Sequence, residues 1–313
     1  MINSKTIEPC SGEPDKDRLL AAFRRESVDF HDINFWAGEN NLSMKYSVAE
    51  DKLPDILEQR LKNYGITATT ITHFNSFYHY PSCGNEMLSG LLKELNERQY
   101  ESNKKKSERS GGANHEKICR FFGAMLLEHE SIYNPEKFEK ILARRYKQGF
   151  RLVRLFPKSH KYPYSYRLLE NIYRVLDSYH FPVMISLDEI DITGDKCIEW
   201  EKLIEIADNF KNMPLIIDGG SAKELMFNNY FFVLLKNSSS IFLNTHNLFG
   251  ANQIEDLSSA SGPHRLVFDS NFPFYDPSIS VERVLGAGLP EDSKRMIASG
   301  SIEKIYSGIG LKK

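Results

Sequence analysis

Most of the chain alternates between short apolar runs and segments whose apolar residues recur at helical spacing. The apolar runs occupy 29–38, 66–74, 118–127, 151–157, 181–187, 213–218, 240–246 and 265–272. Most of these runs are nearly continuous, which is typical of strands that are covered on both faces. A helical pattern follows each run; in 51–64, for example, apolar residues fall at Leu53, Ile56, Leu57 and Leu61. The sequence therefore predicts eight consecutive strand–helix units.

This alternation predicts an α/β protein, specifically a (β/α)8 TIM barrel, whose usual length is about 250 residues. A doubly wound open sheet is the alternative, but no G-x-G-x-x-G follows the first strand, so its dinucleotide-binding form has no support. The sequence also contains no P-loop and no G-x-S-x-G nucleophile elbow. We expect a single barrel domain at 29–313, an N-terminal helical extension at 1–28, and a polar, lysine-rich, flexible insertion at 100–115.

The composition limits the partners and the location of the protein. The chain has 313 residues, of which 41% are hydrophobic and 26% are charged, and its net charge is -2. This balance gives no electrostatic case for nucleic acid or an anionic membrane surface as a partner. No apolar run approaches the ~20 residues that span a bilayer, and the N-terminus lacks the apolar core of a signal peptide. We therefore expect a cytoplasmic protein whose partner is a small molecule and whose four widely spaced cysteines are free thiols.

Polar residues gather where the predicted strands end. In the first strand Asn34 and Trp36 are two positions apart, so both side chains point the same way, into the mouth of the barrel. The active sites of such barrels lie at this face, in the loops that follow the strands. The other polar candidates at strand ends or in the next loops are His73, Arg154, Lys158, His160, Asp188, Asp218 and His246.

These residue types suggest both ligand binding and acid–base chemistry. Arg154 and Lys158 suit a carboxylate or phosphate group of a ligand. His246 is the candidate general base, and Asp218 or Asp188 would orient it or serve as the acid. The cluster as a whole favours a ligand pocket, although any one of these residues taken alone is compatible with a salt bridge or a loop hydrogen bond.

Four segments resemble motifs of the amidohydrolase-related family, a group of TIM barrels that includes lactonases and nonoxidative decarboxylases. Residues 149–157 (GFRLVRLFP) look like its fourth-strand signature, and 32–38 (DINFWAG) resemble its opening D-x-H-x-H-x-G. Residues 84–85 resemble its G-N turn, and 265–273 (RLVFDSNFP) resemble its eighth-strand R-x-x-F-G-S-D-x-P. The resemblance covers 29–307 and implies the barrel fold together with hydrolase or lyase activity.

The same resemblance sets this chain apart from the family at the metal site. Active family members usually hold one divalent metal, commonly zinc, through histidines of the first and fifth strands and an aspartate of the eighth. At those positions this chain has Asn34, Trp36, Ser186 and Asn271, and at a further sixth-strand histidine it has Ile217 or Asp218. Zinc prefers imidazole, thiolate or carboxylate ligands, so we expect no metal cofactor at these positions. The substrate-binding candidates are then Asn34, Trp36, His73, Arg154, Lys158, His160, Ser186 and Asn271.

Three functions remain open. The first is a hydrolase or lyase that acts on a small carboxylate-bearing molecule, such as a lactone, an amide or a carboxylic acid, without the usual metal site. The second is a catalytically inactive barrel that binds a small ligand, and the third is a structural or regulatory protein, which would be favoured if Trp36 filled the mouth. A relocated site for zinc or another divalent metal would use Asp188, Asp218 and His246, with Asp269 one layer deeper. A homodimer is expected only because barrels of this class often form one.

Overall fold

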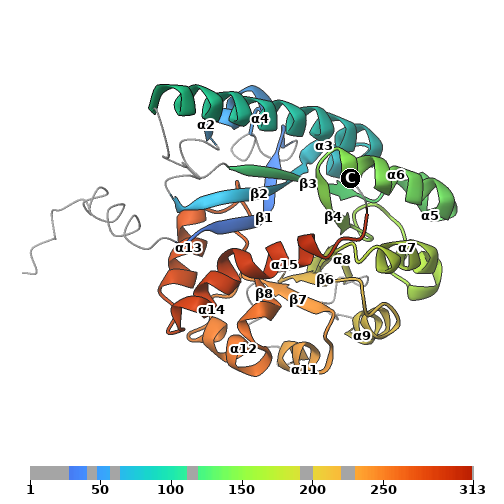
Figure 1. Ribbon diagram of the computed structural model, residues 1–313. Coiled ribbons are helices and arrows are strands. Elements are labelled where there is room, and N and C mark those ends of the chain that lie inside the picture. Colours follow the sequence, from blue (N-terminus) through green and yellow to red (C-terminus); the bar gives the residue numbers. More distant parts are fainter. Residues whose placement is uncertain are drawn as a thin grey trace, which may run out of the picture.

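Eight parallel strands form one sheet that curls into a nearly closed barrel, with helices on its outside (Figure 1). The computed structural model describes residues 28–40, 48–56, 64–110, 119–190, 200–219 and 230–311. The strands are β1 (Phe30–Ala37), β2 (Ile66–His73), β3 (Arg120–Leu126), β4 (Phe150–Leu155), β5 (Val183–Ser186), β6 (Leu215–Asp218), β7 (Ile241–Asn244) and β8 (Leu266–Val267). Each strand overlaps one of the eight apolar runs, so the predicted (β/α)8 barrel is confirmed.

Helices follow the strands and cover the outside of the barrel. Their bounds are α2 (Leu53–Ile56), α3 (Phe74–Tyr78), α4 (Pro81–Ser110), α5 (His129–Tyr133), α6 (Pro135–Lys147), α7 (Tyr166–Ser178), α8 (Leu187–Ile190), α9 (Trp200–Asn209), α11 (Tyr230–Asn237), α12 (Gln253–Ser261), α13 (Pro277–Leu285), α14 (Glu291–Arg295) and α15 (Ser301–Ser307). In α6, Asn134 caps the first turn by accepting a hydrogen bond from Lys137 N at 3.0 Å, and Pro135 is the first helical residue. Among the described residues, none of these helices has both the length and the apolar character to cross a membrane.

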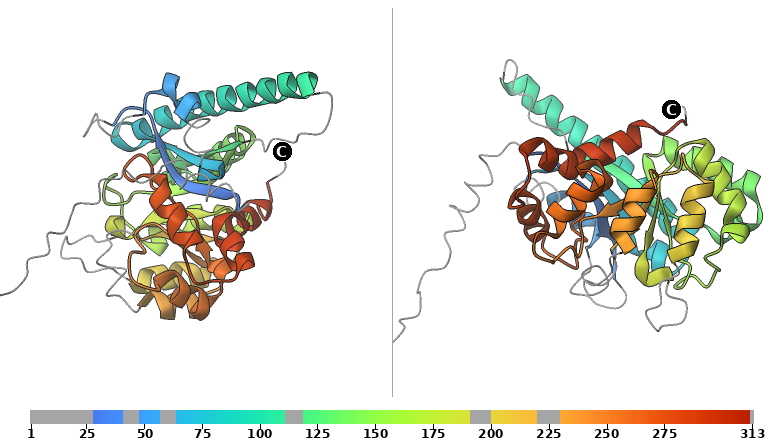
Figure 2. Two further views of the ribbon diagram at one scale, coloured as in Figure 1. Left: turned by 90° about the vertical axis from the view of Figure 1, so that its left-hand side faces the viewer. Right: turned by 90° about the horizontal axis from the view of Figure 1, so that it is seen from below.

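The stretch predicted as an insertion at 100–115 is helical as far as the structure describes it. Helix α4 runs for 30 residues and continues through Ser110, and Figure 2 shows it extending past the barrel. Its polar part is rich in Glu, Lys and Arg, which are good helix formers, and ion pairs such as Arg98–Glu94 at 2.7 Å join successive turns. The rest of that stretch, and the predicted extension at 1–28 apart from Val28, lie outside the described residues.

The N-terminal end of the barrel interior is filled by an apolar layer. The layer consists of Ile33, Ala124, Leu152, Met184, Ile216 and Val267, one side chain from each of six strands. Ile302 and Ile305 of α15 pack against it, so the last helix closes this end. In the part of the chain that the structure describes, this end is filled, and the candidate entrance for a ligand is the opposite end, where the carboxyl ends of the strands lie.

The barrel closes through a short seam between β1 and β8. Backbone hydrogen bonds run from Ile33 N to Phe268 O at 3.3 Å and from Trp36 N to Phe272 O at 2.8 Å. Side chains add to the seam, because Asp32 accepts hydrogen bonds from the backbone N of Ser270 at 3.1 Å and from its hydroxyl. Polar contacts of the first and last strands therefore complete the barrel.

The start of α4 is tied to the end of β3 by Asn85. Asn85 Nδ2 donates to the Leu126 carbonyl at 2.9 Å, and Leu126 N donates to Asn85 Oδ1 at 3.0 Å. Glycine precedes Asn85 because a Cβ at Gly84 would lie 2.1 Å from the backbone N of Ser76 in α3. The Gly-Asn pair thus allows α3 and α4 to pack closely at the carboxyl ends of β2 and β3.

Candidate active site

A polar layer lies directly above the apolar layer of the barrel interior. Side chains on one face of a strand repeat every second residue, so the residue two positions after each apolar interior residue also points inward. Phe242 of β7 is partly buried and packs against the same apolar layer. The polar residues that reach the interior in this way are Arg154, Ser186, Asp218, Asn244 and Asp269. The carboxyl halves of five strands therefore converge on one group of polar side chains.

A β-bulge in β1 brings a further residue into this layer. The register of β1 with β2 shifts between Asp32 and Phe35, where β1 has one residue more than its partner. Asn34 therefore reaches the polar layer although its sequence neighbour Ile33 belongs to the apolar one. There it accepts a hydrogen bond from Arg154 Nη1 at 2.7 Å.

A pocket of about 420 Å³ opens above the polar layer, at the carboxyl ends of the strands. Candidates from the sequence that line it are Trp36, Arg154, Ser186, Asp188, Asp218, His246 and Asn271. Trp36 does not fill the mouth, because it packs to one side, with its ring centre 5.1 Å from that of Phe74 and 6.0 Å from that of Phe156. The structure therefore leaves room for a small ligand.

Arg154 is the cation at the floor of this pocket. Its Nη1 donates to Asn34 Oδ1 at 2.7 Å and to Thr72 Oγ1 at 3.1 Å, and its Nη2 lies 3.7 Å from Asp218 Oδ2. The guanidinium carbon lies 4.7 Å from the centre of the Trp36 ring, which is a cation–π contact. The side chain is only 3% exposed, and a charge so deeply buried requires paired partners of this kind.

The orientation of the Asn34 amide follows from its partners. Its oxygen faces Arg154 Nη1 at 2.7 Å and Trp36 Nε1 at 3.1 Å, two groups that can only donate. The amide nitrogen therefore faces the other way and donates to Asp269 Oδ2 at 3.1 Å and Asn271 Oδ1 at 3.3 Å. Amide orientations are assigned from the hydrogen-bond network, and this network admits only one for Asn34.

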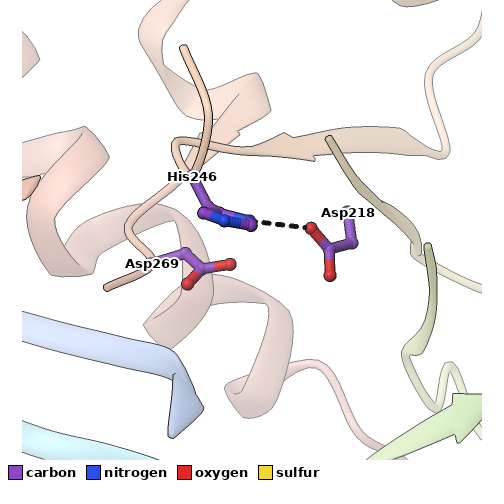
Figure 3. A group of neighbouring side chains, drawn as sticks. All are labelled: Asp218, His246 and Asp269. Carbon is purple, nitrogen blue, oxygen red and sulfur yellow. Dashed lines mark hydrogen bonds and ion pairs between the residues drawn. The ribbon is translucent and has the colours of Figure 1, made fainter. Parts of the chain in front are cut away.

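The same network fixes the tautomer of His246. Because Asn271 Oδ1 accepts from Asn34, the Asn271 amide nitrogen faces His246 Nε2, at 3.1 Å. Nε2 is then an acceptor, and Nδ1 carries the proton that is donated to Asp218 Oδ1 at 3.1 Å (Figure 3). Nε2 is therefore the atom of His246 that can take up a further proton, and His246 lines the pocket.

Asn244, which the sequence did not single out, joins the two buried aspartates of the layer. Its oxygen accepts from Gly219 N at 3.0 Å, so its nitrogen donates to Asp218 Oδ1 at 3.1 Å and to Asp269 Oδ2. Asp269 also accepts from the backbone N of Asn271 at 2.6 Å. Neutral N–H groups thus hold the two carboxylates close to each other.

The titratable groups of the site have pKa values shifted in different directions. Burial lowers the pKa of His246, but the hydrogen bond and charge of Asp218, with the charge of Asp269, outweigh it and raise that pKa overall. Burial raises the pKa of Asp218, but His246 and Arg154 outweigh it and hold that pKa below its usual value. Burial raises the pKa of Asp269 to about 8, against the attraction of the His246 charge. Shifts of this kind on contacting groups in a pocket are typical of functional sites.

Besides Asn34, which contacts Arg154 in the polar layer, three candidates from the sequence lie outside the pocket lining. His73 is fully buried at the end of β2, where its Nδ1 accepts from Asn75 N at 3.1 Å and caps α3. His160 Nε2 donates to the Phe77 carbonyl at 2.9 Å, and Lys158 is exposed. Local structure and solvent, rather than the pocket, therefore surround these three side chains.

The loop after β4 explains the positions of Lys158 and His160. Ser159, between them, donates from its backbone N at 2.9 Å and from its hydroxyl at 2.5 Å to the carboxylate of Glu189. Glu189 lines the pocket, so Ser159 is held toward the pocket while its neighbours make other contacts. The direction of this loop depends on a contact with α8, which strand periodicity in the sequence does not contain.

Aromatic side chains form much of the pocket wall, and the sequence did not single out three of them. Phe156, Phe274 and Tyr275 line the pocket together with Trp36, and the Tyr275 ring centre lies 5.3 Å from that of His246. Phe156 lies two positions after Arg154, so the period of the strand contained a signal for it. Phe274 and Tyr275 lie in the loop after β8, where no such period applies.

Asp218, His246 and Asp269 are the described residues that could hold a metal ion. Each offers one ligand atom, and the three atoms lie within 4.8 Å of one another, as the close approach of the side chains in Figure 3 illustrates. Asp188, which a relocated site was also expected to use, lies at the pocket but outside this group. The sequence thus anticipated two members of the triad from the strand ends and the third from the deeper layer.

The positions that carry the metal ligands in the family that the sequence resembles do not fit a metal here. The Asn34 oxygen is already bonded to Arg154 and Trp36, and the Trp36 indole offers only an N–H donor. Ser186 and Asn271 supply neutral oxygens, which are poor ligands for zinc.

No protein-family model and no curated protein sequence matches the chain. Solved structures do match it, over 90% of its length. An uncharacterised TIM-barrel protein from Bordetella bronchiseptica is 14% identical, with a TM-score of 0.60 over 99% of that chain. A 5-carboxyvanillate decarboxylase from Novosphingobium aromaticivorans, in complex with manganese and a nitrobenzoic acid, is 11% identical, with a TM-score of 0.59 over 96% of that chain. A putative 2-pyrone-4,6-dicarboxylic acid hydrolase from Pseudomonas putida is 15% identical, with a TM-score of 0.58 over 98% of that chain.

These matches concern the fold, because all three sequence identities are low. One of the matched proteins is named as a TIM barrel, and a further match is named as an amidohydrolase. The resemblance drawn from the sequence motifs is therefore confirmed at the level of the fold: the protein is a TIM barrel, and these proteins are similar to it over nearly their whole length.

Proposed function

We propose that this protein is an enzyme, a hydrolase or lyase that acts on a small carboxylate-bearing molecule such as a lactone, an amide or a carboxylic acid. One observation carries the proposal: in a single pocket, one carboxylate is ion-paired with a guanidinium and hydrogen-bonded to an imidazole. These groups are Arg154, Asp218 and His246. Two proteins of similar fold, named as a decarboxylase and a hydrolase of carboxylated substrates, support the proposed class of reaction.

The pocket suits a small planar acid. Its volume of about 420 Å³ lies within the range of small-molecule sites. Aromatic rings form the walls, and Arg154 at the floor offers a positive charge to which a carboxylate can bind. In the described part of the chain the hydrogen bonds of Arg154 come from Nη1, which leaves Nη2 and Nε as donors for a ligand.

A hydrolytic step assigns a role to each group. A water oxygen adds to the carbonyl carbon of the substrate, and His246 Nε2 accepts the proton that this water loses. Asp218 stabilises the resulting imidazolium, and Arg154 holds the carboxylate group of the substrate. The carbon–oxygen or carbon–nitrogen bond then breaks, and the imidazolium returns its proton to the leaving group. Asp188, exposed at the same pocket, is the second candidate acid.

A screen of lactones, amides and small carboxylic acids, read by NMR for turnover and by thermal shift for binding, tests the proposal. We expect His246→Ala to abolish turnover but retain binding, and Arg154→Ala to weaken both. Arg174→Ala, on the exposed face of α7, is the control that changes neither. Binding without turnover across the screen would favour the inactive ligand-binding barrel. Loss of neither property in the two pocket variants would contradict the assignment of the site.

A further inference from the structure

We infer that the guanidinium of Arg154 takes the place of a metal ion in this barrel, as the fixed cation to which an anionic oxygen of the ligand binds. The identity of that ligand as a carboxylate rests on the proposed function, whereas the position of the cation rests on the geometry alone. Three observations support the inference: the partners of Asn34 and Trp36, the donors around the two aspartates, and the unused donors of Arg154.

The first observation is that Asn34 and Trp36, at the positions of the family's two first-strand histidines, both contact Arg154. The Asn34 oxygen accepts from Nη1 at 2.7 Å, and the Trp36 ring centre lies 4.7 Å from the guanidinium carbon. Trp36 Nε1 donates to the same Asn34 oxygen at 3.1 Å and so holds it in place. An amide oxygen and an indole face bind a guanidinium well, whereas an indole offers a metal no ligand atom. Asn34 and Trp36 stand where the family has metal-binding histidines, and both contact the side-chain cation Arg154 instead.

The second observation concerns the carboxylates that could serve a metal. Asp218 Oδ2 lies 3.7 Å from Arg154 Nη2, so one oxygen of that group already faces a positive charge. Asp269 Oδ2 accepts from the amide nitrogens of Asn34 and Asn244, whose orientations are fixed by donor-only partners. A metal ion at these oxygens would have to displace both N–H groups and lie close to the guanidinium, where like charges repel. The side chains around Asp218 and Asp269 are thus arranged for one cation, and Arg154 supplies it.

The third observation is that Arg154 is still available to a ligand. In the described chain both hydrogen bonds of Arg154 to neutral groups come from Nη1, and Arg154 is among the residues that line the pocket. Nη2 and Nε form the side of the guanidinium fork that matches the two oxygens of a carboxylate. Because a guanidinium has no coordination site for water, it cannot generate a metal-bound hydroxide. Water activation then depends on His246 Nε2, the acceptor atom of that ring.

Benzoate binding to the full-length protein tests the inference without any assay of turnover. The protein is purified without nickel affinity and treated with EDTA, and benzoate is titrated by calorimetry and by tryptophan fluorescence, with and without MnCl2. We expect wild type to bind benzoate in EDTA with an affinity that MnCl2 does not change. Arg154→Gln should weaken binding by about tenfold to a hundredfold, the range for loss of a hydrogen bond to a charged group. Arg174→Gln, an exposed arginine of α7, is the matched control and retains the wild-type affinity.

Three results would overturn the inference. Benzoate binding that is lost in EDTA and restored by MnCl2 would show that the cation is a metal. Benzoate binding by Arg154→Gln at wild-type affinity would show that the guanidinium does not hold the anion, and absence of binding to wild type in both conditions would show that the guanidinium is closed to anions. If Arg154→Gln does not fold, as circular dichroism would reveal, the comparison of EDTA and MnCl2 on wild type decides alone. A substrate screen without turnover would contradict the proposed function but leave this inference standing.

Discussion

At the scale of single residues, the direction of the hydrogen bonds decides what the site can do. Arg154 and Trp36 can only donate, so they fix the Asn34 amide. Asn34 in turn sets the orientation of the Asn271 amide. The Asn271 amide nitrogen then donates to His246 Nε2, so the ring proton of His246 is on Nδ1. The chain of bonds ends at Asp218, which can accept but has no proton to give when ionised. The basic atom of His246 is therefore defined by the hydrogen bonds of its neighbours.

The two neighbours of His246 should shift its pKa in opposite directions when they are changed. Asp218→Asn removes the charge that raises this pKa, so burial prevails and the pKa falls. Asn271→Asp places a carboxylate near Nε2, now 3.1 Å from an amide nitrogen, and raises the pKa further. NMR titration of histidine-labelled protein measures both shifts, with Asp256→Asn on the exposed surface of α12 as the unshifted control. Shifts of the same sign in both variants would contradict the hydrogen-bond directions.

At the scale of elements, α4 consists of a packed part and a projecting part. Leu88, Leu91, Leu92 and Leu95 are buried at helical spacing in the packed part. Gly123 in β3 allows this close contact, because a Cβ there would lie 2.9 Å from Leu92 Cδ1. Beyond Leu95 the sequence of the helix is polar, and Tyr100 is 73% exposed. The stability of the barrel therefore depends on the first part of the helix.

We expect Leu92→Ala to lower the free energy of unfolding by about 2–5 kcal/mol, because it leaves a cavity between α4 and β3. Tyr100→Ala on the same helix should change it by less than about 0.5 kcal/mol, because that side chain is exposed. Urea unfolding followed by circular dichroism measures both values. Equal losses in the two variants would mean that the projecting part has contacts that stabilise the barrel.

The same helix shows where sequence patterns predict structure and where they do not. The eight strands could be predicted because burial on both faces leaves continuous apolar runs. The length of α4 could not, because polarity at 100–110 indicates exposure to solvent and does not distinguish a loop from an exposed helix. In the site, Arg154 and Asp218 could be placed by the period of their strands. Lys158 could not, because the contact of Ser159 with Glu189 sets the direction of its loop.

At the scale of the whole molecule, β1 and β2 meet α15 at the closed end of the barrel. His31 in β1 lies with its Nε2 3.1 Å from Thr70 Oγ1, and Thr70 Oγ1 lies 2.9 Å from the hydroxyl of Tyr306 in α15. The His31 ring also stacks on Phe122, with ring centres 5.3 Å apart. Burial, together with the positive charge of Arg120, lowers the pKa of His31 to about 3. The closed end of the barrel therefore holds an uncharged histidine.

This histidine should make the fold sensitive to acid. Between the ordinary pKa of 6.5 and the folded value of about 3, the unfolded chain binds a proton that the folded chain does not. Stability is therefore lost as the pH falls below 6.5, by up to about 1.4 kcal/mol per pH unit. We expect His31→Gln to lose less stability than wild type between pH 6.5 and pH 4.5, measured by urea unfolding. His79→Gln, at an exposed site, should keep the wild-type dependence, and an unchanged slope in His31→Gln would contradict the assignment.

The seam between β1 and β8 gives the candidate site a mechanical role. Asn34 of β1 bonds across this seam to Asp269 and Asn271, next to the contact of Asp32 with Ser270. Asn34 and Asn271, two candidate ligand-binding residues, thus also join the first strand of the barrel to the segment after the last one. A bound ligand would slow the exchange of backbone amide hydrogens along both strands, even where it touches neither. A substitution at Asn34 or Asn271 that changes ligand specificity would likewise change the stability of the contact between β1 and the segment after β8.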